Sequence, residues 1–101
     1  MTDRLKNRAQ SVTVGQVAIS NSTATQLPSA TARRFQLQML LDDTGNFDAR
    51  IAVGGSTVTL ATGWLLSPTD KMPWVVELLN LNMLYAIASI AGQSLNYFGE
   101  Q

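Results

Sequence analysis

The sequence contains neither cysteine nor histidine. Without cysteine no disulfide can form, so the fold is not that of a disulfide-stapled secreted domain. A tetrahedral zinc site is not expected either, because carboxylates alone rarely build one. The absence of histidine also excludes Ser-His-Asp and Cys-His catalytic arrangements. We therefore expect no catalytic residues, no metal site, no cofactor and no enzymatic activity.

Charged residues are scarce, at 14% of the chain, whereas globular proteins usually contain about 25%. Seven basic and seven acidic residues cancel, so no global field is expected to attract nucleic acid or a membrane. Small polar and apolar groups must then cover much of the surface. Such a surface is typical of a protein that packs against copies of itself or a larger assembly, although a soluble monomer rich in surface Ser and Thr would share it.

The chain is long enough for one domain with a modest core. Its first ten residues contain three of the seven basic residues, Arg4, Lys6 and Arg8, and no aromatic residue. Chain ends of this composition are poorly ordered unless a partner binds them. We predict a flexible N-terminal arm over 1–10, with these basic side chains binding a neighbouring subunit, and a folded domain over 11–101.

Valine-rich and alternating segments predict β-strands. Residues 12–19 combine valine and isoleucine with small polar residues, which is typical of a strand. Residues 34–41 alternate with a period of two, so the odd positions from Phe35 to Leu41 are expected to face the core. Asp, Gly and Asn at 42–46 predict a tight turn, and a short return strand is expected at 50–53.

Two more strands are expected at 57–60 and 94–98, where β-branched or aromatic residues follow glycines. Residues 74–91 fit two descriptions. They form either two strands joined near 80–82, with the odd positions from Leu79 to Ile87 on one face, or a leucine-rich helix. We favour the strands. Short strands with frequent turns predict an all-β domain, a small antiparallel β-sandwich or β-barrel.

Asp43-Thr44-Gly45, which follows apolar residues, resembles the active-site loop of aspartic proteases. In dimeric members of that family one Asp from each copy shares a proton, a role that would fall to Asp43. However, Asp42 stands where that family has an apolar residue. A hairpin turn explains the segment better, and a dimeric protease remains the remote alternative. Oxygen-bearing side chains at every second position from 42 to 48 also resemble the start of a calcium loop, but its glycine and glutamate are missing.

The chain has two tryptophans, Trp64 and Trp74. Tryptophan anchors protein interfaces and stacks on sugar rings, but burial in the core is the commoner fate. We assign these two residues, with Val76 and Leu78, to a subunit interface. If the protein instead binds glycans, Trp64 is the residue expected to stack on the sugar.

From residue 11 to the end, the chain resembles small structural proteins of tailed bacteriophages. The features that carry this resemblance are Val-Thr-Val-Gly at 12–15, Ala-Thr-Gln-Leu-Pro at 24–28, the pair Arg33-Arg34, Val-Gly-Gly-Ser-Thr-Val-Thr at 53–59, Leu-Ser-Pro at 66–68, Leu-Tyr-Ala-Ile-Ala at 84–88 and Ala-Gly-Gln at 91–93. The chain differs from the usual pattern in its longer 42–48 turn and its apolar 74–84 segment.

The resemblance implies a β-sandwich or β-barrel that forms a homo-oligomer, with a trimer favoured. Its location would be the capsid surface of the virion, after synthesis in the cytoplasm of the bacterial host. Its partner would be the major capsid protein or another virion protein, and its role that of a capsid decoration (cement) protein that stabilises the shell. The alternative is a tail or tail-fibre protein, acting as a structural or glycan-binding module.

Overall fold

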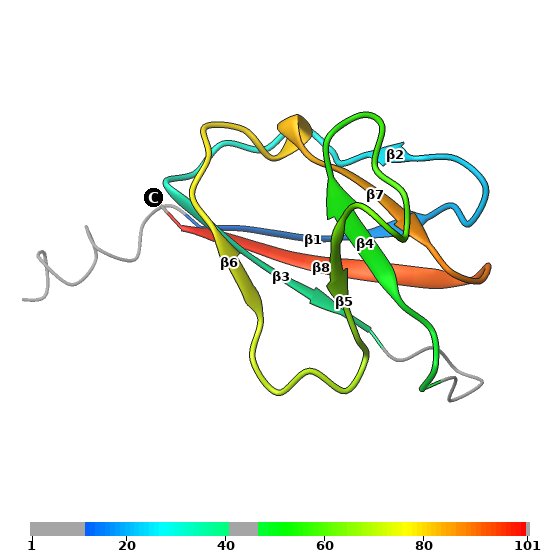
Figure 1. Cartoon of the computed structure of the whole chain (residues 1–101). Helices are drawn as coiled ribbons and strands as arrows, with labels where there is room; N and C mark the ends of the chain where they lie inside the picture. The colour runs from blue at the N-terminus through cyan, green and yellow to red at the C-terminus, as the bar shows by residue number, and fades with distance from the viewer. Residues whose placement is uncertain (1–11, 41–46, 101) are drawn as a thin grey trace, which may run out of the picture.

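The computed structural model describes residues 12–40 and 47–100, which fold into two antiparallel four-stranded sheets (Figure 1). Sheet A has the strand order β1-β8-β3-β6 and sheet B the order β2-β7-β4-β5. The strands are β1 Val12–Ile19, β2 Thr25–Gln26, β3 Arg34–Met39, β4 Ile51–Gly54, β5 Trp64–Leu66, β6 Trp74–Val76, β7 Tyr85–Ala88 and β8 Gln93–Glu100. The predicted all-β fold class is confirmed, as a sandwich. The predicted arm, with Arg4, Lys6 and Arg8, lies outside the described residues.

The core lies between the two sheets and takes alternate residues from each. In β3 the odd positions Phe35, Leu37 and Met39 are buried, as the alternation predicts. Residues of the core cluster are Ile19, Leu27, Ala32, Phe35, Leu37, Met39, Ala49, Ile51, Val53, Leu66, Leu81, Ala86, Ala88 and Leu95. Because this set draws on both sheets, burial of their inner faces holds the sandwich together.

Two glycines of sheet A make room for aromatic rings. Gly99 is the register partner of Phe35, and a Cβ atom on Gly99 would lie 2.7 Å from Cε1 of that ring. Gly15 pairs with Tyr97, and a Cβ atom there would lie 2.4 Å from the tyrosine hydroxyl oxygen. Each ring therefore packs over bare backbone, a known way to offset glycine in a strand.

A loop at residues 55–63, here called the Val58 loop, packs on the outer face of sheet B at Ala52. Val58 is buried there, and a Cβ atom on Gly63 would lie 2.6 Å from Val58 Cγ2 and 2.9 Å from Ala52 Cβ. The strand predicted at 57–60 is wrong, because these residues form turns. Thr59 N donates to Thr62 Oγ1 at 2.9 Å, so threonine side chains bond the local backbone in place of a strand partner.

The turn predicted at 42–46 does not join a hairpin, because β3 lies in sheet A and β4 in sheet B. β4 pairs with β5 and β7 instead. Turn residues indicate that the chain reverses, but they carry no information about the strand that pairs next. Residues 41–46 themselves lie outside the described residues.

Residues 74–91 form two strands, β6 and β7, separated by the three-residue 3-10 turn Leu81–Met83, so the strand prediction is confirmed. Asn80 begins this turn, and its Oδ1 accepts hydrogen bonds from Asn82 N at 3.0 Å and Ala30 N at 3.1 Å. The face predicted for the odd positions is wrong. Ala86 and Ala88 are buried whereas Leu79 and Met83 are exposed, because the turn interrupts the period of two.

Candidate interaction surface

The outer face of sheet A carries large apolar side chains that the core does not use. The strand register places Val14 of β1, Phe98 of β8, Gln36 of β3 and Val75 of β6 in one row across the sheet. Val14 is 66% exposed, Phe98 41% and Val75 48%. Side chains opposite one another on antiparallel strands lie about 4.5–5.5 Å apart. The row is therefore a continuous strip, apolar except at Gln36.

The neighbouring row on the same face consists of amides. Gln16, Asn96 and Gln38 are successive register partners on β1, β8 and β3, and all three are exposed. An open groove of about 500 Å³ is lined by residues of both rows and by Pro73, but not by Val75. Amides offer hydrogen-bond donors and acceptors without formal charge. This face can therefore form both apolar and hydrogen-bonded contacts.

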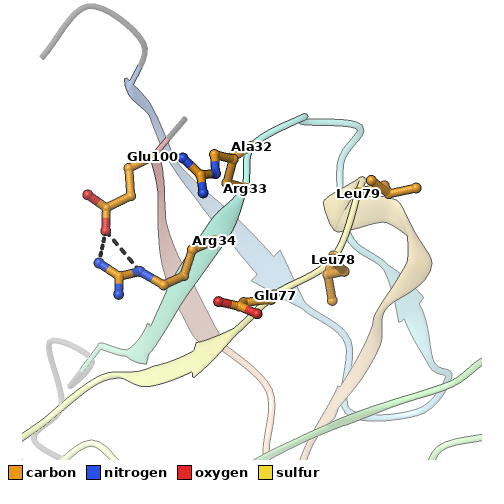
Figure 2. Close-up of a pocket in the computed structure, with 7 residues that line it drawn as sticks. All are labelled: Ala32, Arg33, Arg34, Glu77, Leu78, Leu79 and Glu100. Atoms are coloured by element: carbon orange, nitrogen blue, oxygen red, sulfur yellow. Dashed lines mark hydrogen bonds and ion pairs between the residues drawn. The ribbon is translucent and has the colours of Figure 1, made fainter. Parts of the chain in front are cut away.

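Charged side chains lie at one end of the outer face. They line a pocket of about 700 Å³ beside β6. Arg34 and Glu100 are register partners, and Arg34 Nε donates to Glu100 Oε1 at 3.0 Å. Glu77 lines the same pocket as Arg33 and Arg34, and Figure 2 shows it on the side of Arg34. An anion bound at these arginines would meet two carboxylates, so the pocket does not fit an anion site.

The two tryptophans lie on edge strands of different sheets and contact each other. Trp64 begins β5 of sheet B and Trp74 begins β6 of sheet A, and their rings stack with centroids 6.0 Å apart and an interplanar angle of 19°. The pair thus bridges the two sheets on this side. Burial in the core is the commoner fate of a tryptophan, but Trp64 is 60% exposed. Trp64 lies on β5, which is an edge strand of sheet B.

Three of the four predicted interface residues contribute to the core. Trp74, Val76 and Leu78 are half-buried and pack against the core cluster, which leaves Trp64 as the mainly exposed member. The protease residue Asp43 and most of the calcium-like segment lie outside the described residues. The part of the chain that is described contains no group of three acidic side chains that could hold a metal ion.

The sequence reasoning missed the residues of the outer face, although a signal for them was present. The period of two in 34–41 places the odd positions in the core. It therefore also places the even positions, Gln36 and Gln38, on the opposite, outer face of the sheet. The partners of these amides, Asn96 and Phe98, follow the same rule in β8. The pairing of these strands is what the sequence did not show.

No helix within the described ranges is long and apolar enough to cross a membrane. Comparisons with protein-family models, with curated proteins and with solved structures found no match to this chain.

Proposed function

We propose that this chain is a structural adhesion protein of a bacteriophage virion, most specifically a capsid decoration protein. In this role the outer face of sheet A binds the major capsid protein and stabilises the shell. The observation that carries the adhesive role is the row of Val14, Phe98 and Val75, three exposed apolar side chains gathered on one sheet face. The virion setting rests on the sequence resemblance to small phage structural proteins.

The composition of this face suits such a role. Burying apolar surface contributes roughly 25 cal/mol per Å² before the entropy cost of association. The amides at Gln16, Asn96 and Gln38 can be satisfied by a partner's backbone, whereas buried unpaired charges would oppose binding. A contact of modest strength is sufficient for a decoration protein, because many copies bind one shell and their effects add.

Replacing Phe98 with lysine is expected to weaken binding to the phage shell by about tenfold or more, because the contact would then bury an unpaired charge. The measurement is co-sedimentation of the purified variant with shells that lack this protein. Leu60→Lys is the matched control, because Leu60 is 39% exposed and lies in the Val58 loop on the other sheet. We expect that control to bind within about twofold of the wild type. A wild-type protein that does not bind shells would contradict the proposal.

A second candidate, a glycan-binding module of a tail fibre, is favoured by the amide row beside Phe98. Sugar hydroxyls bond well to amides, and an aromatic ring stacks on the apolar face of a sugar. Here Phe98 replaces Trp64 as the expected stacking residue, because Trp64 already stacks on Trp74.

For this candidate we expect Phe98→Ala and Asn96→Ala to lose retention in gels that contain host polysaccharide. Trp64→Ala should be retained like the wild type, since Trp64 is not one of the residues that line the groove. The measurement is affinity electrophoresis after a glycan array has identified a binding polysaccharide. An array without hits removes glycan binding from consideration and leaves the shell-binding role untouched.

A further inference from the structure

Strand β1 is the longest edge strand in the described part of the chain. It has eight residues, Val12–Ile19, and forms one end of sheet A. Its residues pair one-to-one with β8 from Val12↔Glu100 to Ile19↔Gln93, without a bulge. In an antiparallel ladder roughly half of an edge strand's backbone N–H and C=O groups point away from the sheet. Among the described residues, β8 is the only strand that pairs with β1.

The usual protection of an open edge is absent from β1. Natural sheets block their edges with charged residues, proline, bulges or very short strands. β1 contains neither a charged residue nor proline, and residues 9–32 contain no charged residue at all. The other edge strands differ. β2 has two residues, β5 has three, and the three residues of β6 are flanked by Pro73 and Glu77.

We propose that β1 pairs antiparallel with β1 of a second copy of this chain, so that the two copies of sheet A become one eight-stranded sheet. The free edge of β1 is self-complementary in this arrangement, because a two-fold axis brings the same backbone groups of both copies together. A closed trimer built by edge pairing would need two different complementary edges. Within the described part of the chain, no second edge strand approaches the length of β1. This proposal does not depend on the virion role.

The pairing has a consequence for the outer face of sheet A. Two strands that pair within one sheet keep the same face outward, so both copies present Val14, Phe98 and Val75 on the same side of the dimer. Together with the proposed function, this gives a bivalent protein whose two outer faces can bind neighbouring sites of one shell. The second contact then forms at a high effective concentration.

Sedimentation velocity over micromolar to millimolar protein tests the pairing with two matched variants. Gln16 on β1 and Asn96 on β8 are register partners, exposed on the same face. Gln16→Lys is expected to raise the dimer dissociation constant by about fivefold or more, because it brings like charges to the paired edges. Asn96→Lys adds the same charge one strand further in and should change it by less than about twofold.

Hydrogen exchange of the wild-type protein provides a readout that needs no variant. At high protein concentration, alternate amides of β1 are expected to become protected, whereas dilution should expose them again. A protein that is monomeric at every concentration, or a trimer, would overturn the proposal. Equal effects of the two lysines, or concentration-dependent protection that omits β1, would also overturn it. Phe98→Lys should leave the dimer intact, so that failure of the pairing and failure of shell binding are told apart.

Discussion

Replacing Phe35 with alanine is expected to lower the free energy of unfolding by about 3–5 kcal/mol. Phe35 is fully buried in β3, and its ring packs over Gly99, its register partner on β8. Truncation removes most of the apolar surface of this ring from the core. It also leaves a cavity that Gly99 cannot fill, because glycine has no side chain. Urea unfolding followed by tryptophan fluorescence, at one fixed protein concentration, measures the loss.

Phe98→Ala is the matched control for this prediction. Phe98 lies on the neighbouring strand β8 but points to the opposite face of the same sheet. Its removal is expected to cost about 1 kcal/mol or less, because the ring is already partly in water. Similar losses from the two phenylalanines would mean that both faces of sheet A are buried, which contradicts the assignment of an open outer face.

Replacing Gly63 with alanine is expected to cost about 1–3 kcal/mol. The added Cβ atom would lie 2.6 Å from Val58 Cγ2, 2.9 Å from Ala52 Cβ and 3.1 Å from the Val53 carbonyl oxygen. Ala52 and Val53 belong to strand β4, which is fixed within sheet B. The overlap with the added Cβ atom can therefore be relieved only if the Val58 loop moves away from the sheet. Thermal and urea unfolding both report the loss.

Gly55→Ala, at the other end of the same loop, is expected to change the free energy of unfolding in the opposite direction. A Cβ atom on Gly55 would have no neighbour within 4 Å, and in the described part of the chain the only glycine with a positive φ is Gly92. The substitution should therefore stabilise the protein slightly, by up to about 1 kcal/mol, because it restricts the unfolded chain. If Gly63→Ala were equally harmless, the Val58 loop would not be packed on sheet B.

The two proposals use different parts of sheet A, which makes them separable. Shell binding depends on the side chains of the outer face, above all Phe98, whereas self-association depends on the backbone edge of β1. Phe98→Lys is therefore expected to weaken shell binding and leave the dimer intact. Gln16→Lys is expected to weaken both, because Gln16 lies on the β1 edge and also belongs to the amide row of the outer face. Both substitutions lie on exposed positions, so neither is expected to prevent folding.

The sequence by itself determined the all-β class and the buried side of β3. Both depend on local properties, the enrichment in β-branched residues and the period of two, which each segment carries without reference to its neighbours. The same local information predicted strands at both ends of 74–91. The local pattern gave a wrong prediction at 57–60. A threonine-rich segment can form a strand, or a turn in which the threonine side chains bond the local backbone, and its composition does not distinguish the two.

Only the tertiary structure decided which strands are neighbours. The candidate site, the outer face of sheet A, exists because these particular strands pair. Val14, Gln36, Val75 and Phe98 are far apart in the chain, and pairing of four strands brings them into one row. Strand pairing depends on contacts between distant segments, which no local pattern specifies. For the same reason the sequence could not show that β1 lies at an edge, or that Trp64 stacks on Trp74 at the surface.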